Sequence, residues 1–167
     1  MLWMGFWTSH AEQMRGLKAF YTTEEGQEIG QTLNMVLDCT SMRHFNSVRV
    51  RSEPKEETRQ QAFGFMFDCA LEANKGPQDV AEVFQKWNRY LDSENLDHGV
   101  SAIFPSSGAP EEATGTFKFL WGGDFADVGE TLSFLTKPEA NATWLEITES
   151  TYSCDTFDRG YYFQRYH

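Results

Sequence analysis

One order of elements occurs twice in this chain and limits the folds that the chain can adopt. Residues 2–18 match residues 120–136 at a constant offset, with clustered identities in register. The matched pairs include Leu2 with Leu120, Trp3 with Trp121, Gly5 with Gly123, and Glu12 with Glu130. An offset shorter by three residues then aligns Cys39 with Cys154, each directly before a closing strand. The shared order of strand, interrupted helix, cysteine and strand predicts an internal duplication.

The first part of the chain, residues 1–52, has the pattern of a β-α-β unit. The aromatic-rich residues 2–7 predict a strand, and apolar residues at helical spacing predict helices over 10–21 and 23–37. Residues 45–51 alternate valine with arginine, which is typical of a second strand.

A charged segment without apolar residues, 53–60, follows this part and contains Pro54. Such a composition is typical of a solvated linker. We therefore expect a first part over 1–52 and a second part over 61–167, packed together as one globular unit.

The second part predicts the order β-α-β-β-α-β. Phe63, Phe65 and Phe67 alternate with Gly64 and Met66, so one face of this strand is aromatic. The other expected elements are a helix over 78–91, strands over 98–104 and 116–121, a helical region from 124 that is interrupted at Pro138 and resumes over 141–149, and a last strand over 159–166.

This element order and the duplication resemble the dimeric α/β-barrel superfamily, in which two ferredoxin-like units pair their sheets. The resemblance implies an α+β fold with antiparallel sheets covered by helices. A full ferredoxin-like unit would span about 61–167, preceded by a half repeat over 1–52 that lacks a central strand. That strand would come from residues 61–70, from a partner subunit, or from a longer chain. An exposed sheet edge would favour self-association into a homodimer or larger oligomer.

Ligands in that superfamily generally lie between the sheet and the helices or inside the barrel, and its members include monooxygenases, haem-handling proteins and lactone isomerases. We expect a small apolar or aromatic molecule in an aromatic-lined pocket. The residues expected to line it are Trp3, Phe63, Phe65, Phe67, Phe117, Phe119, Trp121 and Tyr162. The alternatives are a cofactor-independent monooxygenase or isomerase and a structural assembly subunit.

No catalytic residue is assigned from the sequence, and neither a cofactor nor a metal is expected. Glu12 and Glu130 lie in the first turns of their helices, where the helix dipole favours a carboxylate, and a general base would need an apolar pocket as well. The four histidines show no spacing that places two metal ligands on one face. If haem were bound, His44 or His98 would be the axial candidate.

Charge and cysteine content restrict the partners and the location. The net charge of −11 disfavours nucleic acid and anionic membranes as partners. Three cysteines without a CxxC pair suggest a reducing compartment, so we expect a cytoplasmic protein with inert, buried thiols. A bridge between Cys39 and Cys69 is left open in case their strands are neighbours.

Overall fold

The computed structural model describes most of the chain as two compact units. The described residues are 7–36, 45–52, 61–106, 114–155 and 159–164. The first unit spans Met1–Arg43 and the second His44–His167. The predicted linker, 53–60, lies outside the described residues, as does nearly all of the predicted first strand, including Trp3.

The first unit contains the two predicted helices, α1 (His10–Thr22) and α2 (Glu24–Val36). Ser9 is the N-cap of α1 and accepts a hydrogen bond from the backbone N–H of Glu12 at 3.2 Å. The two helices approach closely at Gly26, where a Cβ atom would lie 2.4 Å from the carbonyl oxygen of Phe20. Glycine at this position therefore permits the contact between α1 and α2.

The second unit is built on one antiparallel sheet of six strands. The strands are β1 (Phe45–Arg51), β2 (Gln61–Leu71), β3 (Gly99–Pro105), β4 (Thr116–Gly123), β5 (Tyr152–Cys154) and β6 (Arg159–Gln164). Their order is β1-β3-β4-β2-β5, and β6 pairs with the other half of the β2 edge that β5 uses. The predicted α+β class with an antiparallel sheet is confirmed, and the strand order is compatible with a ferredoxin-like fold.

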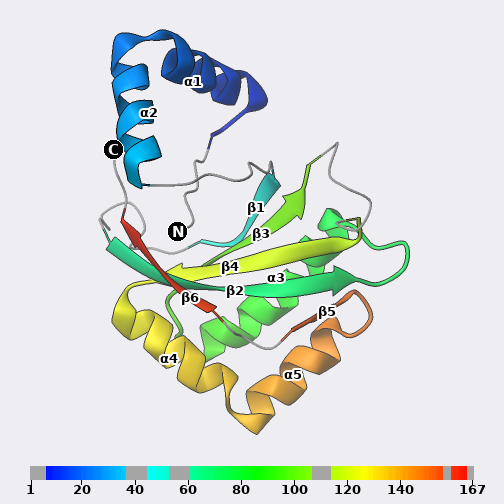
Figure 1. The fold of residues 1–167 in the computed structure, drawn as a ribbon. Helices are drawn as coiled ribbons and strands as arrows, with labels where there is room; N and C mark the ends of the chain where they lie inside the picture. The colour runs from blue at the N-terminus through cyan, green and yellow to red at the C-terminus, as the bar shows by residue number, and fades with distance from the viewer. Residues whose placement is uncertain (1–6, 37–44, 53–60, 107–113, 156–158, 165–167) are drawn as a thin grey trace. The chain divides into compact units, whose positions relative to one another are not determined.

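Three helices cover one face of this sheet (Figure 1): α3 (Pro77–Ser93), α4 (Phe125–Leu135) and α5 (Pro138–Thr148). The apolar stripe of α3 is buried at Val80, Phe84, Trp87 and Leu91, as its helical spacing predicts. The predicted break at Pro138 is confirmed, because proline is the first residue of α5. The short strand β5 was not predicted, since three residues are too few for a recognisable alternation.

The central ladder joins β2 to β4 and places aromatic side chains opposite one another. Phe65 pairs with Trp121 and Phe67 with Phe119. On β4 the side chains alternate between buried and less buried positions, with Phe117, Phe119 and Trp121 on the buried face. The aromatic face predicted from the alternation in β2 therefore lies against the three helices.

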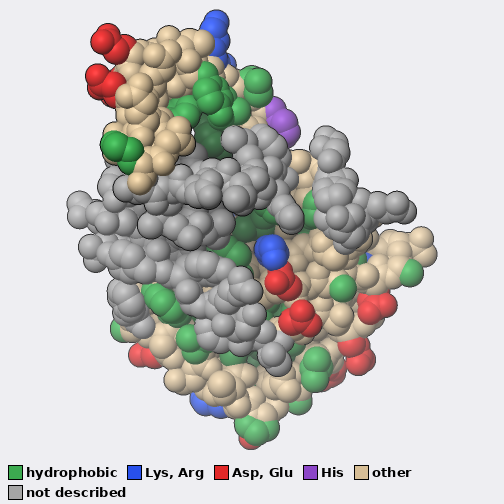
Figure 2. Space-filling view, in the orientation of Figure 1, with side chains coloured by type: hydrophobic (Ala, Val, Ile, Leu, Met, Phe, Trp, Pro, Cys, Tyr) green, Lys and Arg blue, Asp and Glu red, His purple; other side chains and the backbone are tan. Residues whose placement is uncertain are grey.

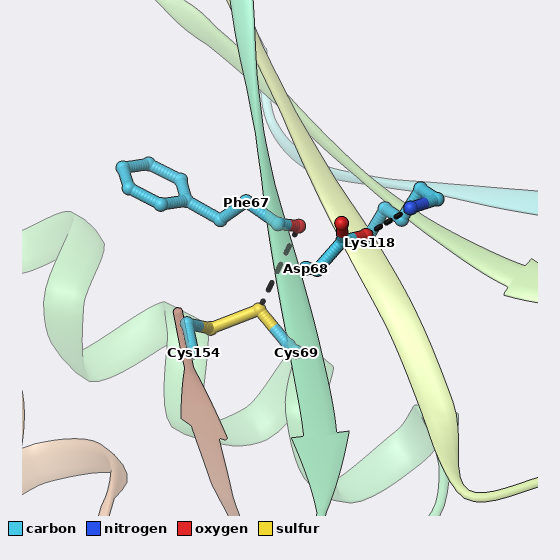
Figure 3. The surroundings of a disulfide bond; sticks show 5 residues. All are labelled: Phe67, Asp68, Cys69, Lys118 and Cys154. Atoms are coloured by element: carbon cyan, nitrogen blue, oxygen red, sulfur yellow. Dashed lines mark hydrogen bonds and ion pairs between the residues drawn. A yellow bond between two sulfur atoms is a disulfide. The ribbon is translucent and has the colours of Figure 1, made fainter. Parts of the chain in front are cut away.

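A disulfide joins Cys69 of β2 to Cys154 of β5 (Figure 3), two residues that are direct partners in the ladder. The backbone N–H of Asp155 donates to the carbonyl of Asp68 at 2.8 Å, which makes that neighbouring pair hydrogen-bonded. The cysteine pair is consequently a non-hydrogen-bonded one, in which facing side chains are closest. Its Cα atoms lie 4.0 Å apart.

The expectation of three inert thiols is wrong for Cys69 and Cys154, and the possible bridge between Cys39 and Cys69 is wrong as well. The bond could not be predicted because the two cysteines are 85 residues apart and one lies in the strand that was not predicted. Disulfides are more typical of oxidising compartments than of the cytoplasm. The cytoplasmic location therefore stays a prediction, and the disulfide argues against it.

Acidic side chains are scattered over the face of the second unit seen in Figure 2. On β2 and β4, Asp68 forms an ion pair with Lys118 on the face opposite Phe67, as Figure 3 shows.

None of the helices that the structure describes combines the length and the apolar character needed to cross a membrane.

Removal of the disulfide should destabilise the protein. We expect the double variant Cys69→Ala, Cys154→Ala to lose about 2–5 kcal/mol of unfolding free energy in urea, because the bond restricts the unfolded chain. Cys39→Ala is the matched control, and its effect should be smaller. Thiol titration of the unfolded, unreduced protein should find one free thiol of the three in the sequence, and three would contradict the bond.

Candidate functional site

Six aromatic side chains form one contiguous group between the sheet and the helices, here called the aromatic cluster. Its members are Phe84, Trp87, Phe119, Trp121, Trp144 and Tyr152. Trp144 of α5 is central: its ring lies 5.0 Å from that of Trp87, 5.8 Å from that of Tyr152 and 6.3 Å from that of Trp121, between centroids. Edge-to-face contacts of this kind add to the burial of apolar area.

The residues predicted to line a pocket belong mostly to this buried face. Phe65, Phe117, Phe119 and Trp121 are at most 2% exposed, and they pack against other aromatic rings. Phe63 and Phe67 are partly buried and pack against the same core.

Two predicted pocket residues are not described in the same detail. Tyr162 pairs through its backbone with Phe63, and its side chain is outside the description. Trp3 lies outside the described residues, so its predicted role stays a prediction.

His98 is an ionisable residue that is almost completely buried in the second unit. It lies directly before β3, is 1% exposed, and its ring stacks on Trp121 with centroids 4.9 Å apart and planes inclined by 20°. Its Nδ1 is 2.8 Å from the hydroxyl of Thr131 on α4. A Cβ atom at Gly123 would lie 3.2 Å from Val128 and 3.7 Å from Cβ of His98, so glycine permits this close packing.

The hydrogen bonds of Thr131 favour one tautomer of His98. The Thr131 hydroxyl donates its single proton to the carbonyl of Asp127 at 2.9 Å, one turn earlier in α4. With the Thr131 proton on the Asp127 carbonyl, the imidazole is the donor at Nδ1. A neutral imidazole with a proton on Nδ1 has none on Nε2, so Nε2 carries a free lone pair.

Burial, together with a smaller effect of the positive charge of Arg51, lowers the pKa of His98 from 6.5 to about 3. The imidazole is thus neutral at physiological pH.

Stability should fall in acid because of this histidine. Below pH 6.5 the unfolded chain binds a proton at His98 while the folded chain does not, so the contribution present above 6.5 is lost as the pH falls toward about 3. The loss should reach about 1.4 kcal/mol per pH unit. We expect His98→Phe, which keeps a ring against Trp121, to flatten the profile of unfolding free energy between pH 7 and 4. Parallel profiles for the two proteins would contradict a neutral, buried His98.

Five buried side-chain atoms of the described residues have no hydrogen-bond partner. They are Nε of Arg51, Nε1 of Trp87, Nε2 of His98, Nε1 of Trp121 and the hydroxyl oxygen of Tyr152. An unpaired buried polar group costs about 1–3 kcal/mol, so a native protein usually has a reason for each one. Three of the five belong to the aromatic cluster, and a fourth, Nε2 of His98, belongs to a ring that stacks on Trp121 of that cluster.

A groove of about 640 Å³ opens between the end of α3 and helix α4. This α3–α4 groove is lined by Glu94, Leu96, Ala126, Gly129, Glu130, Ser133, Phe134 and Lys137. Leu96 and Phe134 are at most 8% exposed and form its apolar floor. The ring of Phe134 lies 6.4 Å from that of Trp87, so the floor connects the groove to the aromatic cluster. Lys137 lies over the Phe134 ring at 5.4 Å.

Gly129 leaves room in the groove. A Cβ atom there would meet no heavy atom within 4 Å, and the residue lies within α4. We expect Gly129→Ala to raise the unfolding free energy by about 1 kcal/mol, because alanine favours the helix. Gly26→Ala is a contrasting variant that should destabilise α1 and α2, since its Cβ would lie 2.4 Å from a carbonyl oxygen. An equal effect of both in thermal unfolding would contradict this account.

A second hollow, of about 480 Å³, lies beside the end of β1. The guanidinium of Arg51 lies at this hollow and donates to the carbonyl of Leu96 at 2.8 Å and to Asn88 at 3.3 Å, with Asp92 at 2.8 Å. These contacts tie the edge strand β1 to the C-terminal end of α3. Arg51 therefore stabilises the packing of β1 against the end of α3.

The two recurring glutamates differ in surroundings. The N–H and hydroxyl of Thr8 donate to the Glu12 carboxylate at 2.8 and 2.6 Å, and these bonds hold its pKa below the usual range. Glu12 therefore acts in capping α1. Glu130 is exposed and lines the α3–α4 groove.

No metal-binding group of three His, Cys, Asp or Glu side chains occurs among the residues that the structure describes. Of the two haem candidates, His98 is buried as described, and His44 lies outside the described residues.

Sequence reasoning did not identify Thr131, Phe134 or Leu96 as parts of the site. A signal for Thr131 was present, because a polar residue occupies a helical stripe together with Val128 and Leu135. No sequence signal pointed to Leu96, since it lies in a connection between α3 and β3.

Comparison of the chain with known protein families, curated proteins and solved structures found no significant match.

Proposed function

We propose that this protein binds a small apolar or aromatic molecule in the α3–α4 groove, above the aromatic cluster. The observation that carries the proposal is the apolar floor of the groove, which rests on aromatic side chains with unpaired polar atoms. Ligand sites are typically 300–1,000 Å³ in size, mostly apolar, with a few polar groups that orient the ligand. The groove falls in this range at about 640 Å³.

The strand order supports a ferredoxin-like unit as the scaffold of this site. Helix α3 connects β2 to β3, and α4 and α5 connect β4 to β5, in a sheet with the neighbours β3-β4-β2-β5. This is the order β-α-β-β-α-β of a ferredoxin-like unit. Membership of the dimeric α/β-barrel superfamily, with an incomplete first repeat, is part of this proposal.

A neutral probe tests the binding site. We expect N-phenyl-1-naphthylamine to bind saturably, with a rise in its fluorescence and quenching of tryptophan emission. Gly129→Phe should lower its affinity at least about tenfold, because the new ring fills the groove and meets no other atom at Cβ. Asn141→Phe, an exposed position on α5 outside the groove, is the matched control and should bind normally. Unsaturable binding by the wild type, or equal affinity of the two variants, would refute the proposal.

An isomerase-like or monooxygenase-like enzyme is the second candidate, favoured by the unprotonated Nε2 of His98. A general base works best when its pKa is near the operating pH. The pKa of His98 is about 3, so this nitrogen is better suited to accept a hydrogen bond than to remove a proton. Binding is therefore the function that the geometry supports best.

Self-association remains part of the proposal inferred from the superfamily resemblance. Native mass spectrometry measures the assembly and any retained small molecule together. A dimer or larger assembly would support a barrel formed by two sheets, whereas a monomer would refute it.

A further inference from the structure

The helices α1 and α2 of the first unit, here called the helix pair, bury almost nothing between them. Of residues 7–35, whose side chains the structure describes, Gly26 alone is buried. Each helix has 13 residues, and isolated helices shorter than about 12–15 residues are marginal in water. Helices of this length gain their stability by packing an apolar face. The helix pair therefore needs a surface to pack against.

Both helices present apolar side chains to solvent. The α1 stripe consists of Met14, Leu17 and Tyr21 at helical spacing, and Met14 and Tyr21 are 62% and 61% exposed. The α2 stripe consists of Ile29, which is 48% exposed, and Leu33 one turn later. In Figure 2, hydrophobic side chains lie on the visible surface of the first unit. Exposed apolar surface of this kind is typical of a protein interface.

The charges beside the two stripes have opposite signs. Lys18 follows Met14 by one turn and borders the α1 stripe, and Arg15 is the other basic residue of that helix. Glu25 precedes Ile29 by one turn and borders the α2 stripe. Helix α2 contains three glutamates and neither lysine nor arginine. The α1 stripe is therefore bordered by positive charge and the α2 stripe by negative charge.

A second copy of the helix pair is the partner that these charges fit. A two-fold interface brings the same patch of two copies together, so the patch has to be complementary to itself. One basic and one acidic helix meet this requirement when α1 of each copy lies against α2 of the other. The second unit is a poorer partner for the acidic α2, because residues 44–167 contain eleven Lys and Arg against twenty Asp and Glu.

We propose that two copies of this protein associate through their helix pairs. The α1 and α2 stripes of both copies form one apolar core of four helices, and Lys18 of each copy lies beside Glu25 of the other. This interface is independent of the α3–α4 groove and of the sheet pairing that the superfamily resemblance implies.

Sedimentation velocity of the full chain tests the proposal through a charge exchange. We expect the wild type to be a dimer at micromolar concentration. Lys18→Glu and Glu25→Lys should each raise the dissociation constant at least about tenfold, because like charges then meet across the interface. An equal mixture of the two variants should dimerise again, since both contacts of the mixed pair join opposite charges. Both residues are exposed, so the folded chain tolerates either change.

Lys86→Glu is the matched control, because it makes the same charge change at an exposed position of α3 in the second unit. This variant should associate as the wild type does. A monomeric wild type would overturn the proposal and indicate that the stripes are covered within one chain. A dimer that withstands both Lys18→Glu and Glu25→Lys would overturn it in favour of paired sheets. A mixture of the variants that stays monomeric would contradict the contact between α1 and the α2 of the other copy.

Discussion

The pairing of β2 with β4 determines which side chains meet inside the second unit. Eight residue pairs fix the register, from Phe63 with Gly123 to Ala70 with Thr116. A shift of one residue would turn every side chain of a strand to the other face. With this register, the phenylalanines of β2 and the aromatic residues of β4 share one face, and α3, α4 and α5 must supply side chains that fill it. Trp144 of α5 does so at the centre of the aromatic cluster.

The same register also allows a polar side chain, that of His98, to be buried within this apolar core. Gly123 and Gly122 at the end of β4 leave space for the residues that begin β3, so His98 stacks on Trp121 in place of an aliphatic residue. Thr131, from the helix that follows β4, then orients the imidazole. A buried histidine with one satisfied and one unsatisfied nitrogen is costly unless something binds the second nitrogen. That cost is the physical reason to regard this place as functional.

Much of the fold could be predicted because its signals are local. The alternation in Phe63–Phe67, the stripe of α3 and the break at Pro138 each reflect backbone periodicity over a few residues. Strand β5 and the Cys69–Cys154 bond escaped prediction, because they depend on contacts between segments 85 residues apart. The site was predicted in part: Trp121 was named for the aromatic face, but its neighbours Thr131 and Leu96 come from elements whose packing a single sequence does not specify.

The second edge of β2 is shared by two strands, and this arrangement limits how the end of the chain can vary. Cys154 pairs with Cys69 and Gln164 with Gln61, so a step of ten residues along the last segment corresponds to a step of eight along β2. The surplus of two is even, and an even surplus keeps the alternation of the two strands in phase. Deleting two residues between β5 and β6 would allow one continuous strand, whereas deleting one would force one of them to present its opposite face. Length variation in this connection is therefore expected to occur in steps of two.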